Sequence, residues 1–418
     1  MQLTLPRVVK VKQHFQGPTI SNIDQKIAEE FMKTEIEAKV REGMNIAITA
    51  GSRGIANIAK IIQATANEIK KRGANPFIIP AMGSHGGATA EGQIEVLESF
   101  GITEEYCGAE IRSSMEVVEV GKTEAGMPVY IDKIGYESDG VILVNRIKAH
   151  TDFSSKIESG LMKISSIGLG NHKQAQAIHT YGVHGIRDHM PKVAEVVFQT
   201  GKVLMGIGII ENAFEDTAEI EAIPVESIQE RESKLLSYSK TLLPKLPIDK
   251  VDILFVDKIG KNYSGTGMDT NVIGRIRILG TKEFTKPEID YIIAGDLSEE
   301  SHGNALGIGL ADVTTEKLFK KVDYKKMNEN VITSTFLQRA SIPIVLESDQ
   351  AAIETALRAS WGKSPEMIRF MRIPNTLHLE ELYVSESLVP EIEKSDNLEI
   401  VGELAPMKFD ETGYFNHF

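Results

Sequence analysis

Apolar residues in the first half of the chain alternate between strand-like and helix-like spacing. The segment MNIAITA (44–50) is short and apolar and ends at Gly51, as a buried strand does. Residues 55–73 carry apolar side chains at helical spacing, with lysine and arginine in the last turn and Gly73 as a stop. The apolar stretch NPFIIPAM (75–82) predicts a second strand. This order predicts a parallel βαβ unit.

The same alternation continues to residue 150. The turn GSHGG (83–87) precedes a helix that we expect to begin near Ala88. Residues 115–133 predict two strands joined by a glycine-containing turn, and SDGVILVNRIKAH (138–150) predicts another buried strand. A mainly parallel sheet with helices on its faces is therefore expected for this half.

A second α/β pattern begins after LLPKLPIDK (242–250), whose two prolines and polar end are typical of a linker. Apolar runs then predict strands at 251–257, 289–297 and 342–348, with helices at 314–322 and 349–362. We expect two α/β domains with mainly parallel sheets and a ligand cleft between them. The expected divisions are an N-terminal domain at 1–247, a C-terminal domain at 248–400 and a tail at 401–418 that crosses back to the first domain.

Composition narrows the class of protein. The chain has 418 residues, of which 42% are hydrophobic and 25% charged, so it can bury sizeable cores. A net charge of -13 disfavours general binding to nucleic acid or to anionic membranes. The single cysteine, Cys107, excludes an intrachain disulfide framework and a cysteine-based zinc site. The first residues lack the apolar core of a signal peptide, and no run is long enough to span a membrane, so a cytoplasmic location is expected.

Three predicted strands of the first domain are followed by a side chain suited to chemistry. Arg53 follows the first strand, His85 the second and His150 a later one. Each residue alone is more often a surface charge or a structural polar group. Because ligands bind outside the carboxyl ends of strands in open α/β sheets, the shared position favours a ligand site.

The segment after His150 adds a lysine and a possible metal ligand. Lys163 lies among small and apolar residues, where it could extend along the surface or be a desolvated, nucleophilic amine. The segment 171–182 predicts a short helix that ends near Gly182. Its His172 and His179 share a face but lie about 10 Å apart at ~1.5 Å per residue, too far to bind one ion together. The residues alone leave any metal site incomplete.

These residues resemble the nickel-dependent lactate racemase family, over most of the first domain and with four separated positions in the family's order. The family uses a nickel-pincer nucleotide, a pyridinium-3,5-bisthiocarboxylate mononucleotide that carries nickel. By this resemblance, Lys163 in GLMKISSIG matches the lysine that attaches the cofactor covalently. His179, sixteen residues later, matches the nickel-ligating histidine. Two sulfur donors and one carbon of the cofactor would complete a roughly square-planar site.

The resemblance also implies the roles of the strand-end residues. His85 in GSHGG and His150 in KAHTD match the two catalytic acid/base histidines, and Arg53 in GSRG matches the arginine that binds the substrate carboxylate. The chain departs from the family elsewhere. His150 and Lys163 are thirteen residues apart, a few more than in the lactate enzymes, and the lysine follows Leu-Met instead of Gly-Arg.

The second domain lacks a clear counterpart of the family's Tyr-Gln pair and lysine. MDTNVIGRIR stands in that region, so Arg275 or Arg277 is expected to replace the lysine. Trp361, the only tryptophan, is a candidate to line the substrate pocket. The glycine-rich stretch 298–315 precedes a predicted helix and is either packing or a phosphate or substrate contact.

The resemblance implies an isomerase, a racemase or epimerase of a 2-hydroxy acid that works by reversible hydride transfer to the cofactor. Cofactor-maturation proteins are expected partners. The changes in the second domain favour a longer substrate, such as a sugar acid or malate, over lactate. Two other functions stay open: a hydrolase or lyase with a simple divalent ion, and a non-catalytic sensor of a nucleotide or organic acid.

Overall fold

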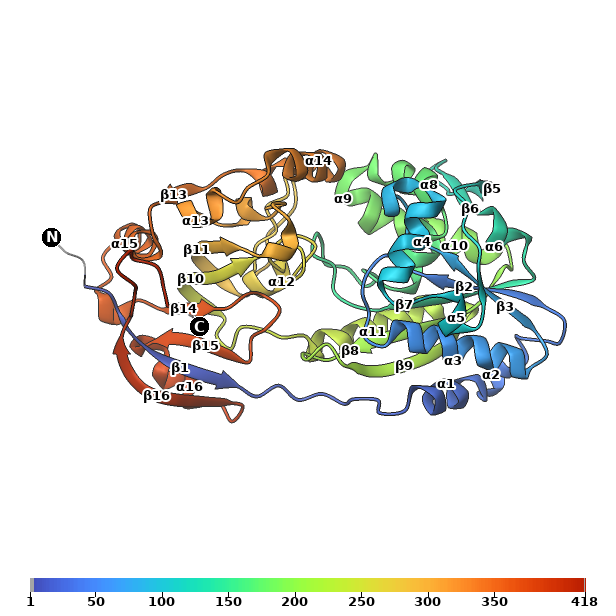
Figure 1. The fold of residues 1–418 in the computed structure, drawn as a ribbon, viewed down its shortest axis with the longest axis horizontal. Helices are drawn as coiled ribbons and strands as arrows, with labels where there is room; N and C mark the ends of the chain where they lie inside the picture. Colours follow the sequence, from blue (N-terminus) through green and yellow to red (C-terminus); the bar gives the residue numbers. More distant parts are fainter. Residues whose placement is uncertain (1–3, 417) are drawn as a thin grey trace. The chain divides into compact units, whose positions relative to one another are not determined.

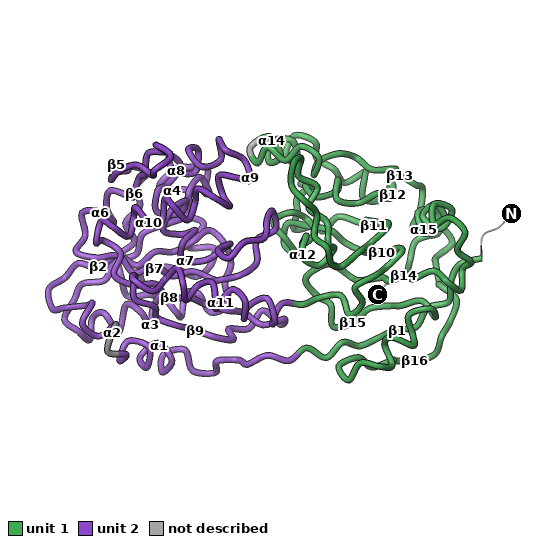
Figure 2. Tube along the Cα trace, turned by 180° about the vertical axis from the view of Figure 1, so that it is seen from behind, with its two compact units in different colours: residues 1–15, 244–418 green, residues 16–243 purple. Residues whose placement is uncertain are grey.

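The computed structural model describes residues 4–416 and residue 418. The chain divides into two compact units (Figure 2). Unit 2 is the continuous stretch Gln16–Leu243, and unit 1 combines the residues up to Phe15 with those from Pro244 onwards. Among the described residues, no helix is long and apolar enough to cross a membrane.

Unit 2 is built on a six-stranded sheet in the order β4-β3-β2-β7-β8-β9 (Figure 1). All neighbouring pairs are parallel except β8 and β9. A separate hairpin is formed by β5 and β6. The strands are β2 (Asn45–Ala50), β3 (Asn75–Pro80), β4 (Glu110–Ile111), β5 (Val117–Lys122), β6 (Pro128–Asp132), β7 (Gly140–Arg146), β8 (Val203–Glu211) and β9 (Thr217–Pro224).

Helices cover the sheet of unit 2, which explains why its strands are apolar on both faces. On one face, alternate residues such as Ile46 and Ile48 of β2 pack in one core with α1 and α3. On the other, α11 contacts β8. The helices are α1 (Ile23–Phe31), α2 (Thr34–Glu37), α3 (Ile58–Lys71), α4 (Ala90–Ser99), α5 (Glu104–Cys107), α6 (Lys133–Glu137), α7 (Leu161–Lys163), α8 (Asn171–His179), α9 (Gly182–His184), α10 (Met190–Gln199) and α11 (Ile228–Leu242).

Unit 1 contains an eight-stranded sheet in the order β13-β12-β11-β10-β14-β15-β1-β16. The strands from β13 to β14 are parallel, and β15, β1 and β16 continue the sheet in antiparallel pairs. The strands are β1 (Arg7–Gln13), β10 (Lys250–Ile259), β11 (Glu288–Leu297), β12 (Val313–Thr315), β13 (Ile344–Leu346), β14 (Phe370–Ile373), β15 (Glu381–Ser385) and β16 (Leu398–Pro406).

Helices and the C-terminal residues pack against the sheet of unit 1 and complete its hydrophobic cores. Apolar residues of α15 pack with Phe255, Ile293 and Phe370 on one face of the sheet, and Phe415 packs against this cluster. The helices are α12 (Thr270–Ile273), α13 (Glu316–Phe319), α14 (Tyr324–Ser334), α15 (Asp349–Ala359) and α16 (Val389–Ile392).

The expected fold class, two α/β units with mainly parallel sheets, is confirmed. The expected division at 247 differs from the structure at both ends of the chain. Strand β1 pairs with β15 and β16, so the first residues join unit 1 instead of the N-terminal domain. The tail 401–418 does not cross back, because β16 pairs with β1 and Phe415 packs in the core of unit 1.

Candidate active site

Three of the predicted site residues follow strands that are neighbours in the sheet of unit 2. Strand β2 lies between β3 and β7, and all three run parallel, so their carboxyl ends share one edge. Arg53, His85 and His150 follow these strands in turn. The chain leaves β2 towards β3 and reaches β7 on the other side, so a crevice of the kind that binds ligands is expected between their ends.

His150 and Lys163 form the central pair of the site. The Lys163 Nζ lies 3.0 Å from His150 Nε2. His150 Nδ1 accepts the backbone N–H of Asp152 at 3.1 Å, which makes Nε2 the protonated nitrogen of a neutral ring. The ring is 9% exposed and stacks on Phe153, with 4.6 Å between the ring centroids. In this tautomer Nε2–H donates to the Lys163 Nζ, and only the neutral form of the amine can accept that hydrogen bond.

Lys163 stands where the short helix α7 changes into a wider π-helical turn, Ile164–Gly168. Such turns are frequent at functional sites because they redirect a side chain. Burial is the main cause that lowers the pKa of Lys163, to about 8. The charge of Asp152 opposes this shift, whereas Arg53 and Lys148 add to it. The amine is therefore much more often neutral near pH 7 than an ordinary lysine.

His85 presents one ring nitrogen to the same site. Its Nδ1–H donates to the carbonyl of Met82 at 2.8 Å, which leaves the Nε2 lone pair as the basic position. Burial and then the charge of Arg53 lower the pKa of His85, and the Met82 carbonyl works in the opposite direction. Lys163 and His179 also lower this pKa, so their charges lie within electrostatic range of the ring.

Arg53 and His179 complete a cluster of five predicted residues in unit 2. The Arg53 side chain reaches solvent, yet surrounding protein lowers its pKa, as does the charge of Arg146. The pKa of His179 is lowered by burial and then by Lys163, although its ring is open to solvent. A guanidinium and neutral imidazoles that are crowded but accessible suit the binding of an anionic ligand.

Buried acidic residues that were not predicted support this cluster. Glu211 pairs with Arg146 and accepts the backbone N–H of Ala56 at 2.7 Å, which holds the loop of Arg53. Glu158 accepts the N–H of His150 at 2.7 Å, and Glu232 accepts the N–H of Met162 at 2.9 Å. No sequence signal marked Glu158, which follows Asp152 and Lys156 in a mixed polar segment.

The predicted residues of the second domain have other partners. Arg275 and Arg277 both pair with Asp312, at 2.6 and 2.5 Å, and donate to backbone carbonyls of unit 1. Trp361 is 89% exposed after the end of α15. In the stretch 298–315, Ser298 and Ser301 hydrogen bond to each other at 2.7 Å in a buried turn, as packing requires.

The remaining histidines of the 171–189 segment do not join the central pair. His184 contacts Asp188 at 3.0 Å on an exposed surface, and His172 Nδ1 is buried without a hydrogen-bond partner. No three histidine, cysteine or acidic side chains are grouped as metal ligands within the described part of the chain.

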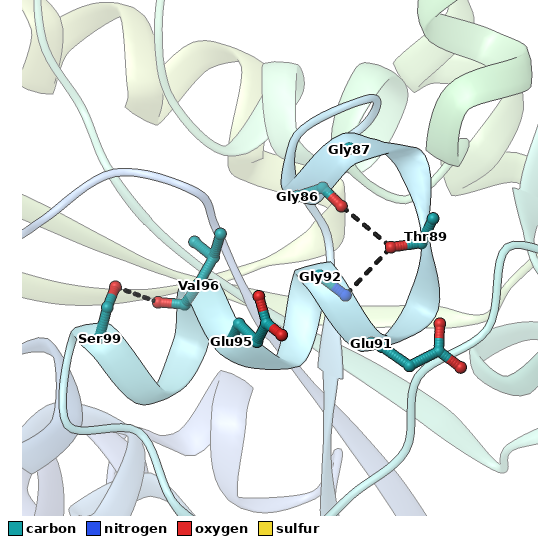
Figure 3. Close-up of a pocket in the computed structure, with 8 residues that line it drawn as sticks. All are labelled: Gly86, Gly87, Thr89, Glu91, Gly92, Glu95, Val96 and Ser99. Atoms are coloured by element: carbon teal, nitrogen blue, oxygen red, sulfur yellow. Dashed lines mark hydrogen bonds between the residues drawn. The ribbon is translucent and has the colours of Figure 1, made fainter. Parts of the chain in front are cut away.

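A depression of about 580 Å³ lies beside the loop of His85, along the first turns of α4 (Figure 3). Its lining includes Gly86, Gly87 and Thr89, with Glu91 and Glu95 on the helix. None of the five clustered residues lines it. Two carboxylates make it a poor place for an anionic ligand, so the candidate active site is the strand-end cluster.

Comparisons with known proteins identify a similar family and a similar fold. Residues 7–188 match the family described as the lactate racemase N-terminal domain, a range that contains all five clustered residues. The fold is similar to the structure of the lactate racemase apoprotein from Thermoanaerobacterium thermosaccharolyticum. That match covers 88% of this chain and 98% of the other, with a TM-score of 0.51 and 11% sequence identity. No curated protein matches the sequence.

Proposed function

We propose that the protein is a racemase or epimerase of a 2-hydroxy acid, because residues 7–188 match the lactate racemase N-terminal domain family. The observation that carries the proposal is the cluster of Arg53, His85, His150, Lys163 and His179 at one edge of the sheet. Its residue types match what such a reaction needs: a carboxylate-binding cation, two acid/base groups, an attachment point and a metal ligand.

The residues fit a nickel-pincer nucleotide. Lys163 offers a half-buried amine whose pKa is lowered to about 8, as covalent attachment requires. His179 offers an imidazole whose lowered pKa keeps it neutral and able to ligate a soft divalent metal. When bound, the cofactor would accept a hydride from the substrate C2 and return it. Cofactor-maturation proteins are then required partners.

Proton transfer falls to His85 and His150. The His85 Nε2 lone pair is available because Nδ1 donates to Met82, so this ring can take the hydroxyl proton of one stereoisomer. His150 has Nε2 as its protonated nitrogen, and in its imidazolium form it would donate that proton to the other stereoisomer. Each turnover needs one ring neutral and the other as imidazolium, and the two rings exchange these roles when the reaction runs in the opposite direction.

Arg53 is assigned to the substrate carboxylate, for which a guanidinium offers two parallel N–H donors. Arg275 and Arg277 are already paired with Asp312, so neither is assigned to the substrate. The substrate class is thus a 2-hydroxy acid, including longer members such as sugar acids and malate, and Trp361 is given no role.

The test begins with the chain produced together with cofactor-making proteins. Intact mass and nickel analysis should show one added nucleotide on Lys163 and one nickel per chain. Single 2-hydroxy acid stereoisomers are then incubated in deuterated water and analysed by chiral chromatography and mass spectrometry. Hydride transfer retains the C2 hydrogen, so interconversion without deuterium at C2 is expected.

Two variants separate the roles. His179→Ala should lose nickel, whereas His85→Ala should keep nickel and the mass increase but lose turnover. Racemisation with deuterium incorporated at C2 would replace hydride transfer with proton abstraction. A chain that gains neither mass nor nickel would refute the proposed cofactor.

A further inference from the structure

Helix α11 contacts both segments that carry the central pair of the candidate site. Glu232, Leu236 and Lys240 are spaced four residues apart and so share one face of the helix. We propose that α11 is a positioning helix, which holds Lys163 through Glu232 and holds His150 through the ion pair of Lys240 with Glu158. This inference rests on the function proposed above for Lys163 and His150.

Glu232 fixes the start of the turn that carries Lys163. Its side chain is fully buried, and its Oε2 accepts the N–H of Met162 at 2.9 Å. Met162 directly precedes Lys163, so the carboxylate holds the backbone next to the amine. An acidic group at the first N–H groups of a helical turn also satisfies donors that have no partner within the turn.

The close approach of Glu232 leaves no room for a side chain at position 160 unless the carboxylate moves. A Cβ atom on Gly160 would lie 2.5 Å from Glu232 Oε1, which is closer than such atoms pack. From the other side, Asn145 of β7 donates its side-chain N–H to the Gly160 carbonyl at 2.8 Å. The start of the Lys163 turn is therefore held between a strand end and α11.

Glu158 holds the backbone of the loop that carries His150. It is 1% exposed and accepts the N–H of His150 at 2.7 Å and that of Ser155 at 2.9 Å. Lys240 compensates the buried charge, with its Nζ 2.6 Å from Glu158 Oε1. A buried carboxylate keeps its charge only with such partners, so Lys240 is what allows Glu158 to organise the loop.

The effects of Glu232 and of Glu158 can both be measured through the pKa of the Lys163 amine. It lies 3.0 Å from His150, so displacement of either segment exposes it to water. Neither Glu232 nor Glu158 is among the charges that shift the Lys163 pKa. A change of that pKa in variants at these positions would therefore report movement instead of a lost charge.

The experiment uses the full chain without the nucleotide and compares charge-matched substitutions. Glu232→Gln and Glu158→Gln keep an oxygen acceptor, whereas Glu232→Leu and Glu158→Leu remove it. The midpoint of Lys163 acetylation against pH is measured by competitive labelling with acetic anhydride and peptide mass spectrometry. Each Leu variant should have a midpoint about one unit above its Gln partner, which is about tenfold slower labelling at pH 7.

The matched control is Glu230 on the same helix, which is exposed and pairs with Lys234. Glu230→Gln and Glu230→Leu should give the wild-type midpoint. Equal midpoints for the Gln and Leu variants, in proteins that circular dichroism finds folded, would overturn the positioning role.

If a Leu variant does not fold, Glu232→Asp and Glu158→Asp take its place. These substitutions keep the carboxylate but shorten the side chain by one methylene, which moves the acceptor away from the backbone. The midpoint of Lys163 acetylation should therefore rise by about half a pH unit. An unchanged midpoint would refute the inference. The proposed function is tested separately, because labelling does not use the cofactor. A chain that labels as expected but never binds nickel would refute the function and leave the positioning role standing.

Discussion

At the scale of single residues, the charge of Lys163 determines what the site can do. A neutral amine accepts a hydrogen bond from His150 Nε2–H and is nucleophilic, whereas an ammonium repels Arg53 and Lys148. The protein keeps the neutral form accessible by surrounding the amine with protein atoms. Burial of the charged amine opposes folding, so it should lower the free energy of unfolding.

Lys163→Met should raise the free energy of unfolding at pH 7 by about 2 kcal/mol. The pKa falls from 10.5 to about 8 on folding, one unit is ~1.4 kcal/mol, and solvent at the half-buried amine screens part of this. Between these two pKa values the unfolded chain binds more protons, so wild-type stability rises with pH. Urea unfolding should show that the difference in free energy of unfolding between Lys163→Met and wild type is smaller near pH 10 than at pH 7.

Arg53→Met should raise the pKa of His85. The positive charge of Arg53 is the second cause of the lowered value, after burial, so its removal favours the protonated ring. Titration of the His85 ring by NMR checks this without any need for turnover. Arg53→Lys keeps the charge and serves as the control, and an unchanged pKa in Arg53→Met would remove Arg53 from the site.

The five clustered residues could be predicted because strand ends and sequence order are local properties. Arg53, His85 and His150 follow short apolar runs, and the resemblance supplied Lys163 and His179. Glu158 and Glu232 could not be predicted, because an isolated glutamate in a sequence carries no sign of its burial. The packing of α11 brings the Glu232 carboxylate to the backbone of Met162 and places Lys240 beside Glu158.

At the scale of elements, the strongest apolar patterns became strands and helices within a few residues of the prediction. The run 44–50 is β2 from Asn45, and the run 289–297 is β11 from Glu288. The helix expected over 171–182 ends earlier, at His179. The π-helical turn after Lys163 had no sequence signal, because its apolar spacing is shared with ordinary helices.

The pairs of Arg275 and Arg277 with Asp312 organise one element junction of unit 1. Asp312→Ala should lower the free energy of unfolding by about 2 kcal/mol, because two guanidiniums lose their counter-ion in a partly buried setting. Chemical denaturation measures the change. Asp290→Ala, at a more exposed neighbour, is the control and should change stability by less than about 0.5 kcal/mol. Full stability of Asp312→Ala would return the two arginines to the list of substrate ligands.

At the scale of the whole molecule, the division into two units could not be read from local patterns. The pairing of β1 with β15 joins residues that are hundreds of positions apart. The spacing of apolar residues along the chain does not predict which distant strands pair. The linker near 247 was predictable from its prolines, and the structure divides the chain at Leu243 and Pro244.

Residues 16–243 should fold alone, because they form one compact unit with their own core. The fragment should show cooperative thermal unfolding and a Lys163 labelling midpoint near pH 8, since Asp152, Arg53 and Lys148 all lie within it.

By contrast, deletion of residues 1–13 from the full chain should abolish cooperative unfolding of unit 1, because it uncovers β15 and β16. A stable unit 1 after this deletion would contradict the pairing.

The position of β1 between β15 and β16 also fixes an order of events during synthesis. Arg7 of β1 contacts Glu386, 379 residues later, so its strand partners do not yet exist when it leaves the ribosome. At about 5–20 residues per second, β1 waits roughly 20–80 seconds for them. Unit 2, which ends at Leu243, is complete well before that moment. The nascent chain therefore contains all of unit 2 while its first strand is still unpaired, and that strand pairs only after β15 and β16 have been made.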